Sequence, residues 1–125
     1  MQRLGAILAL AVSLAACGKS TTDASNTSAT GDFDITIGSG LHPTYTWPGG
    51  TAFSISVVRV SAGGTIVWGV AKPGSMDIAS PVTHGTVPSG AIATATTEAT
   101  LTAGVAYRVS ITRADQKTGY KEFTR

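Results

Sequence analysis

Short runs of alternating apolar and polar residues cover most of the chain from Asp32 to Arg125, and they constrain its fold more than any other feature. The runs lie near residues 33–37, 44–47, 53–57, 66–70, 107–111 and 120–125. Period-two alternation is typical of strands with one buried and one exposed face. Gly and Pro residues separate the runs, and no window of ten or more residues carries a helical stripe. The pattern predicts a single antiparallel β-sandwich of about seven strands.

The alternation also predicts which side chains face the core. The expected inward residues are Phe33, Ile35, Ile37, Tyr45, Trp47, Phe53, Ile55, Val57, Ile66, Trp68, Val70, Tyr107, Val109, Ile111 and Phe123. Trp68 could instead be an exposed platform for a sugar ring, but its alternation with Ile66 and Val70 favours the core. The Ala-rich residues 91–103 contain many Thr residues, which suit a strand better than a helix. The strand order through residues 69–100 stays open.

The first sixteen residues have the pattern of a signal peptide. Arg3 is followed by an apolar stretch from Leu4 to Leu14. About eleven helical residues at about 1.5 Å each span only about half of a bilayer's hydrocarbon core. This stretch is therefore too short for a stable membrane-spanning helix, and residues 1–16 are predicted to be removed on export.

The end of this segment, Leu14, Ala15, Ala16 and Cys17, resembles a bacterial lipobox, the recognition sequence of the lipoprotein signal peptidase. The resemblance implies cleavage before Cys17, a diacylglycerol thioether on its sulfur and acylation of its new amino group. Cys17 is the one cysteine of the chain, so no intrachain disulfide can form. The alternative is an ordinary secretory signal that leaves a free thiol. A residue other than Asp after the lipidated Cys implies transfer to the outer membrane in Gram-negative lipoproteins, and Gly18 fits that rule.

Residues 17–31 are predicted to be a lipidated Cys followed by a disordered tether. From Gly18 to Gly31 the chain contains no large apolar residue and is rich in Ser and Thr. Such a segment cannot bury enough surface to offset the entropy lost on ordering its backbone. A simple spacer is the plainer interpretation, and a glycan-bearing Ser/Thr tract is the alternative. The folded domain is expected to span residues 32–125.

The run LTAGVAYRVSI, residues 101–111, resembles the segment of fibronectin type III domains in which a Leu precedes, by six residues, the Tyr that opens strand F. Trp47, after an alternating run, is similar to that family's strand-B Trp. The resemblance implies a fibronectin type III-like sandwich in which Leu101 and Tyr107 form a tyrosine corner and Trp47 is the core aromatic. Sandwiches of this kind carry many unrelated functions, so the resemblance implies no ligand.

The titratable residues give only weak signals for a chemical site. His42 and His84 could form a metal pair, but they do not have the spacing of a known zinc motif. Asp32 and Asp34 flank Phe33 and could offer carboxylates to calcium, but a third nearby acid is lacking. No GxSxG elbow occurs. The sequence therefore predicts no catalytic residue, no metal site and no cofactor.

The formal net charge of +2 and the mixed signs exclude a protein whose main partner is nucleic acid. A mild basic bias occurs near the C-terminus, where Arg113, Lys117, Lys121 and Arg125 stand against Asp115 and Glu122. These charges could touch anionic lipid or lipopolysaccharide. Solubilising charge that protects a hairpin and an edge strand is the simpler interpretation.

Taken together, these features predict a lipid-anchored protein of the bacterial cell envelope, placed in the outer membrane. Its sandwich would be a non-catalytic binding or structural module whose partner is another envelope protein or a glycan. An accessory subunit that stabilises a larger envelope complex is the alternative. A small glycan-binding or enzymatic domain is the third hypothesis.

Overall fold

A computed structural model of the chain describes residues 30–125, and for Thr30 and Ala62 it describes the backbone alone. The predicted signal peptide, the lipidation site Cys17 and almost all of the predicted tether lie outside these residues. The described elements are β1 (Thr30–Gly31), β2 (Thr36–Ile37), β3 (Thr44–Thr46), β4 (Ala52–Arg59), the 3-10 turn η1 (Val60–Ala62), β5 (Thr65–Ala71), β6 (Val82–Thr83), β7 (Ile92–Ala95), β8 (Ala106–Arg113) and β9 (Thr118–Thr124). No helix within this range is long or apolar enough to cross a membrane.

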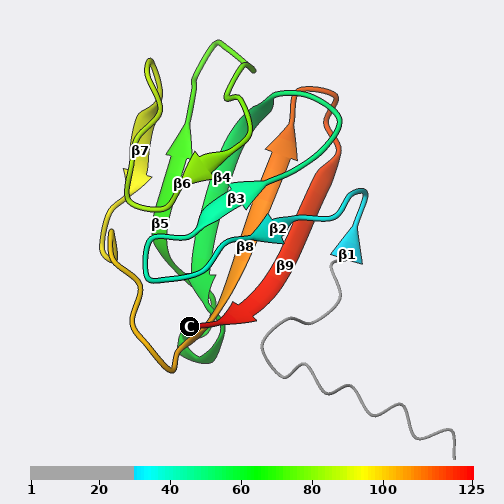
Figure 1. The fold of residues 1–125 in the computed structure, drawn as a ribbon. Coiled ribbons are helices and arrows are strands. Elements are labelled where there is room, and N and C mark those ends of the chain that lie inside the picture. The colour runs from blue at the N-terminus through cyan, green and yellow to red at the C-terminus, as the bar shows by residue number, and fades with distance from the viewer. Residues whose placement is uncertain (1–29) are drawn as a thin grey trace, which may run out of the picture.

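The described strands form two antiparallel sheets that pack as a sandwich, as Figure 1 shows. The larger sheet has the order β1-β9-β8-β4-β5-β7, and the smaller has the order β2-β3-β6. The predicted all-β, two-sheet fold is therefore confirmed. β1 pairs with β9 through Thr30 and Gly31, so the larger sheet begins before the expected domain boundary at Asp32.

The core lies between the two sheets and consists of the inward residues of the alternating runs. Tyr107, Val109 and Ile111 on β8 are fully buried, and Phe123 on β9 is 2% exposed. Tyr45 from the smaller sheet packs on Trp68 and Phe123 of the larger sheet, with ring centroids 6.4 and 6.1 Å apart. The prediction that Trp68 faces the core is confirmed. Phe33 and Ile37 pack on this core and are partly exposed.

The prediction that Phe53 faces the core is wrong. Its side chain is 37% exposed, whereas the neighbouring Ala52 is fully buried. The pairing of β4 with β8 shifts register between Ala52 and Ser54, so Phe53 is the extra residue of a β-bulge. A bulge breaks the period of two and changes the face on which the preceding side chain lies.

The prediction that Ile66 faces the core is wrong for the same reason. Ile66 is 49% exposed, while Val67 is 3% exposed and Trp68 is buried beside it. Val57 pairs with Trp68 and Val58 pairs with Ile66, so Val67 is the unpaired residue of a bulge. Extrapolating back from Trp68 in steps of two therefore selects the wrong neighbour.

The structure gives the strand order through residues 69–100, which the sequence left open. After β5 the chain makes an isolated bridge between Ile78 and Ala52 and then adds β6 to the smaller sheet beside β3. It returns to the larger sheet as β7, which pairs with β5. Only Ile92–Ala95 of the Ala- and Thr-rich stretch is a strand, and residues 96–105 connect it to β8.

Candidate functional site

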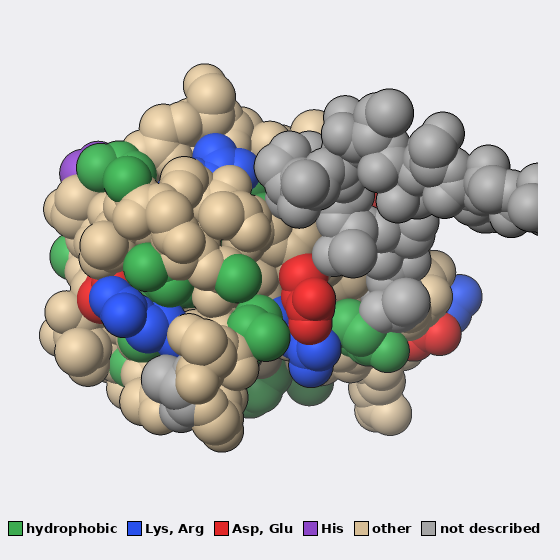
Figure 2. All heavy atoms as spheres, turned by 90° about the horizontal axis from the view of Figure 1, so that it is seen from below, with side chains coloured by type: hydrophobic (Ala, Val, Ile, Leu, Met, Phe, Trp, Pro, Cys, Tyr) green, Lys and Arg blue, Asp and Glu red, His purple; other side chains and the backbone are tan. Residues whose placement is uncertain are grey.

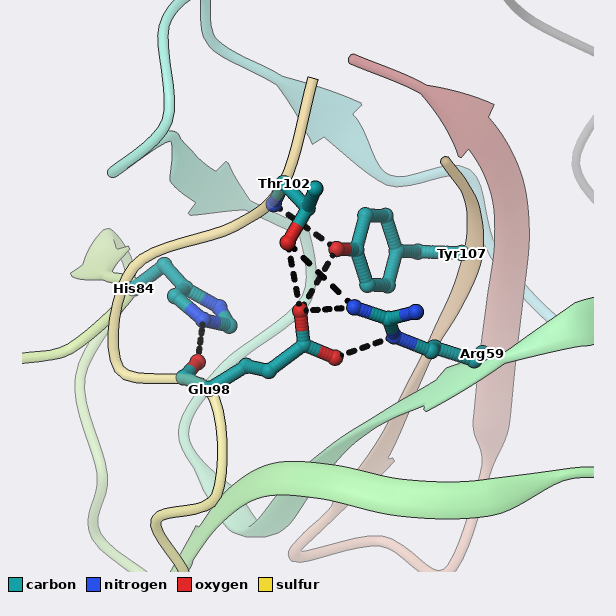
Figure 3. A network of polar contacts seen from close by, with 5 residues as sticks. All are labelled: Arg59, His84, Glu98, Thr102 and Tyr107. Carbon is teal, nitrogen blue, oxygen red and sulfur yellow. Dashed lines mark hydrogen bonds and ion pairs between the residues drawn. The ribbon is translucent and has the colours of Figure 1, made fainter. Parts of the chain in front are cut away.

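Four polar side chains gather where the connection from β7 to β8 passes the end of β4, and we call them the Glu98 cluster. Its members are Arg59, Glu98, Thr102 and Tyr107, shown in Figure 3. Arg59 donates from Nε to Glu98 Oε2 at 2.5 Å and from Nη2 to Oε1 at 2.6 Å. Thr102 Oγ1 and the Tyr107 hydroxyl also donate to Oε1, at 3.0 and 2.9 Å. Four donors therefore surround one carboxylate.

The backbone of Glu98 is held as firmly as its side chain. Its N–H donates to the carbonyl of Val67 at 2.8 Å, and its carbonyl accepts from His84 Nε2 at 2.7 Å. The hydrogen bonds from Arg59 are the main cause that lowers the pKa of Glu98 from 4.5 to about 2. Because the carboxylate is ionised and fully occupied by donors, it is suited to anchoring the connection and poorly suited to moving protons near neutral pH.

Leu101 lies in this connection and Tyr107 lies at the start of β8, and both of these expected corner residues belong to the buried core. The Tyr107 hydroxyl accepts a hydrogen bond from the N–H of Thr102 at 2.8 Å, five residues upstream. Its ring stacks on Phe123 with centroids 5.8 Å apart. Leu101 is 2% exposed, and its N–H donates to the carbonyl of Leu41. The hydroxyl of Tyr107 thus joins the start of β8 to the turn before it.

Trp47, the expected core aromatic, is 4% exposed and belongs to the same core as Tyr107. Its indole Nε1 donates to the carbonyl of Gly50 at 2.8 Å, and its backbone N–H donates to Ser80 Oγ at 3.0 Å. A buried Trp needs such a partner for its N–H. The ring therefore supports both the core and the turn after β3.

His84 is fully buried, and both of its ring nitrogens are occupied. Nε2 donates to the carbonyl of Glu98, so Nδ1 accepts the hydroxyl of Tyr45, 2.8 Å away. Its ring lies 4.5 Å from that of Trp68. Burial lowers the pKa of His84 below its ordinary value of 6.5, and burial likewise raises the pKa of Tyr45. This neutral histidine links the two sheets and offers no free nitrogen to a ligand.

The candidate metal residues do not form a shared site. His42 Nε2 contacts Thr100 Oγ1 at 2.9 Å, and His84 is occupied as described. Asp32 accepts the N–H of Thr118, whereas Asp34 accepts the N–H of Ile35 and lies 3.4 Å from Lys121 Nζ. Within residues 30–125 no group of three His, Cys, Asp or Glu residues could hold a metal ion.

The basic residues near the C-terminus are mostly engaged with the protein itself. Arg113 is 9% exposed, donates to the carbonyl of Pro48 and to Asp115, and lies 4.6 Å from the ring centroid of Phe33. The bonds from Arg113 lower the pKa of Asp115 to about 2. Arg125 donates to the carbonyl of Gly38 at 2.6 Å. Arg113 and Arg125, two of the four basic residues near the C-terminus, thus stabilise loops through hydrogen bonds to backbone carbonyls.

The molecular surface shows mixed charge. In Figure 2, basic and acidic side chains lie next to each other at several places, and no large area of one sign is visible on this face. The exposed aromatic side chains are Phe53 on β4 and Tyr120 on β9, at 37% and 36% exposure. They lie on strands separated by β8, so they do not form a row.

One open hollow lies on the smaller sheet, with a volume of about 340 Å³. It is lined by Asp34, Thr36, Thr46, Trp47 and Pro48. Thr36 and Thr46 are cross-strand partners and both are exposed. Its lining offers one carboxylate, two threonine hydroxyls and no histidine, and no hydrogen bond among the described residues pairs a hydroxyl of this lining with a base.

Glu98 and Arg59 are the residues of this region that sequence reasoning missed. They are 39 positions apart, and neither belongs to a recognisable motif. One signal was present, because Glu98 is the single charged residue in the long stretch between Asp77 and Arg108. An isolated acid in an Ala- and Thr-rich segment needs a cation partner if the fold buries it.

Comparison with protein families, with curated proteins and with solved structures finds no match to this chain.

Proposed function

We propose that this chain is a lipid-anchored protein of the bacterial cell envelope whose sandwich is a non-catalytic binding or structural module. The observation that carries the proposal is the run Leu14-Ala15-Ala16-Cys17 behind an apolar segment too short to span a bilayer. Several acyl chains on one residue give nearly permanent anchoring, because each buried methylene contributes about 0.8 kcal/mol. Gly18 after the Cys favours the outer membrane.

The position of the folded domain supports this proposal. The first strand begins at Thr30, and a Ser/Thr-rich stretch without large apolar residues separates it from Cys17. A spacer of this composition would hold the sandwich clear of the lipid head groups. The domain would then meet partners through its loops or strand edges, and those partners would be another envelope protein or a glycan.

We further propose that the sandwich is fibronectin type III-like. The neighbours β9-β8-β4-β5 follow the order of strands G, F, C and C′ in immunoglobulin-like sandwiches. The hydrogen bond from the Thr102 N–H to the Tyr107 hydroxyl supports the assignment of a tyrosine corner at the start of strand F. β7 is an additional strand beside β5 in this arrangement.

The state of the titratable groups supports a binding or structural role over catalysis. Glu98 and Asp115 are held ionised by arginines, and His84 is held neutral by burial. A general acid or base needs a pKa near the working pH and room for a substrate. Each of these groups is instead part of an internal contact.

Membrane fractionation of cells that express the full chain tests the anchor. The wild type and a Ser20→Ala control should be labelled by palmitate and sediment with membranes, whereas Cys17→Ala should be unlabelled and leave the membrane fraction. Protease treatment of intact cells then distinguishes a surface-facing domain, which is digested, from a periplasmic one, which is protected. If Cys17→Ala behaves as the wild type does, the lipoprotein assignment is wrong.

A further inference from the structure

The open hollow on the smaller sheet includes the cross-strand pair of Thr36 and Thr46. Its volume of about 340 Å³ is within the range of small-molecule sites, roughly 300–1,000 Å³. In Figure 1 the smaller sheet lies in front of the larger one, so the outer face that carries these two threonines is turned toward the reader. The hollow is therefore open to solvent and large enough for a ligand of the size of a sugar ring.

The two threonine hydroxyls of the hollow are free to bind a ligand. Thr36 and Thr46 are both exposed, and no hydrogen bond among residues 30–125 uses either hydroxyl. By contrast, the hydroxyl of Ser80 already accepts the backbone N–H of Trp47. Directly opposed residues of an antiparallel pair have Cβ atoms about 5 Å apart. Because each hydroxyl can donate and accept, the pair offers two adjacent groups to a ligand that is rich in hydroxyls itself.

Asp34 gives the hollow an acceptor whose charge is already balanced. Its Oδ1 accepts the N–H of Ile35 at 2.9 Å and lies 3.4 Å from Lys121 Nζ, while its Oδ2 has no partner among the described residues. The side chain of Asp34 is 68% exposed and that of Lys121 is 17% exposed. A cation in the hollow would meet the Lys121 ammonium, and an anion would meet the carboxylate. A neutral ligand with hydroxyl groups avoids both repulsions and can donate to Oδ2.

A set of threonines continues from the hollow across the outer face of the smaller sheet, and we call it the threonine strip. Thr44 pairs with Thr83 of β6 and lies two positions from Thr46, about 7 Å along β3. Every outward position of the described strands β2, β3 and β6 is a threonine. The strip comprises Thr36, Thr44, Thr46 and Thr83 and carries no charge. A chain of sugar units along β3 would therefore meet one hydroxyl after another.

We propose that the hollow and the threonine strip bind a neutral glycan chain, with one sugar ring in the hollow and its hydroxyls donating to Asp34. The exposed Pro48 and the edge of Trp47, whose buried ring is fixed by its bond to the Gly50 carbonyl, form the apolar wall for the C–H groups of that sugar. A protein partner fits less well, because protein interfaces are centred on apolar anchors. None of the exposed large hydrophobic residues of the described range lies in the hollow or the strip. This inference rests on the binding role proposed above and selects the glycan among its partners.

Binding to an array of neutral oligosaccharides of glucose, mannose, galactose and N-acetylglucosamine tests the ligand class, with polygalacturonate as the anionic control. The full chain is used in a detergent without a sugar head group, because such a head group would compete for the hollow. At least one neutral oligosaccharide should bind, and polygalacturonate should bind at least about tenfold more weakly. Binding of no neutral oligosaccharide would overturn the proposal, as would equal or tighter binding of polygalacturonate. Membrane fractionation of Cys17→Ala is a separate measurement, so a failure of either proposal is seen independently of the other.

Titration calorimetry with the oligosaccharide that binds locates its site. Asp34→Asn removes the charged acceptor and Thr46→Val removes one hydroxyl at nearly constant shape, so each should raise the dissociation constant about tenfold. The matched controls are Asp77→Asn, an exposed aspartate in another ion pair, and Thr124→Val, an exposed threonine on β9, and both should bind as the wild type does. Circular dichroism establishes that all four variants are folded. Folded Asp34→Asn and Thr46→Val variants with the wild-type affinity would place the ligand elsewhere and contradict the proposal.

Discussion

Arg59 and Glu98 form a two-bond ion pair that joins the end of β4 to the connection between β7 and β8. The side chain of Glu98 is 12% exposed and that of Arg59 is 34% exposed. The pair lies at the sheet end where Tyr107 begins β8, so one carboxylate joins the end of β4 to a connection 39 residues later and to the start of β8. Charge-assisted, two-pronged bonds of this kind are stronger and more specific in geometry than neutral ones.

Replacing Glu98 with Gln should destabilise the domain more than replacing the Tyr107 hydroxyl does. Gln keeps the size of the side chain but loses the charge and one acceptor oxygen, so Arg59 loses a two-pronged partner. Urea unfolding followed by tryptophan fluorescence measures the effect. Glu122→Gln, in the exposed ion pair with Arg108, is the control and should change stability by less than about 0.5 kcal/mol. Equal losses of stability in Glu98→Gln and Glu122→Gln would show that burial adds nothing to the pair of Glu98 with Arg59.

The stability of the domain at acid pH should depend on the ionised carboxylate of Glu98. The folded-state pKa of Glu98 is about 2 against an ordinary value of 4.5, so the unfolded chain binds more protons in this range. The stability contributed by Glu98 is present above about pH 4.5 and is lost as the pH falls toward 2. The free energy of unfolding of Glu98→Gln should therefore vary less with pH over this window than that of the wild type. An unchanged slope in the variant contradicts the role of Glu98.

Tyr107→Phe should lower the free energy of unfolding by about 1 kcal/mol, because it removes the acceptor of the Thr102 N–H and a donor to Glu98. The midpoint of denaturant unfolding measures the loss. Tyr120→Phe is the matched control, since Tyr120 is 36% exposed, and should stay within about 0.5 kcal/mol of the wild type. No shift in the Tyr107→Phe midpoint would argue against the corner.

His84 should make stability fall on mild acidification. Its folded-state pKa is below its ordinary value of 6.5, so below that pH the unfolded chain takes up a proton that the folded chain resists. The melting temperature should therefore decrease as the pH falls from 7 to 5. His84→Gln should flatten this dependence, while His42→Gln, at an exposed position, should keep it. If both variants keep the wild-type slope, another group controls stability in this range.

Because of the bulge in β5, a polar substitution should destabilise the domain at Val67 and not at Ile66, which is the opposite of what periodicity predicts. Val67→Thr should destabilise the domain by about 1 to 3 kcal/mol, because it buries a hydroxyl at a position that is 3% exposed. Ile66→Thr should change stability by about 0.5 kcal/mol at most, because Ile66 is 49% exposed. Thermal unfolding of the two variants compares them directly. The opposite ranking would restore the simple alternation through Ile66.

Period-two alternation predicted most of the strands because each half-buried strand repeats its pattern locally. β8 is the clearest case, since Tyr107, Val109 and Ile111 are inward without interruption. The errors at Phe53 and Ile66 share one cause, which is that a bulge depends on how a strand pairs with its neighbour. The partner strand is distant in sequence, so a local pattern contains no record of the register shift.

The candidate site was less predictable than the fold. The resemblance to fibronectin type III domains predicted that Leu101 and Tyr107 form a corner, but nothing in the sequence indicated that Arg59 and Glu98 would meet at the Tyr107 hydroxyl. The sequence indicated His84 only as a possible partner of His42 in a metal pair, and its burial between Tyr45 and Trp68 arises from packing of the two sheets. Polar contacts across many residues depend on the three-dimensional path of the chain, which alternation does not encode.

The sequence by itself determined the all-β class, because alternation and turn residues act within a few positions of each other. It also carries the whole basis for the proposed anchor, because the proposed recognition of Leu14 to Cys17 by a signal peptidase depends only on a short local run of residues. Only the tertiary structure decided the strand order around β6 and β7, the bulges at Phe53 and Val67 and the Glu98 cluster. These features arise when strands far apart in the chain pair and bury charge, and long-range pairing energies have no local signature.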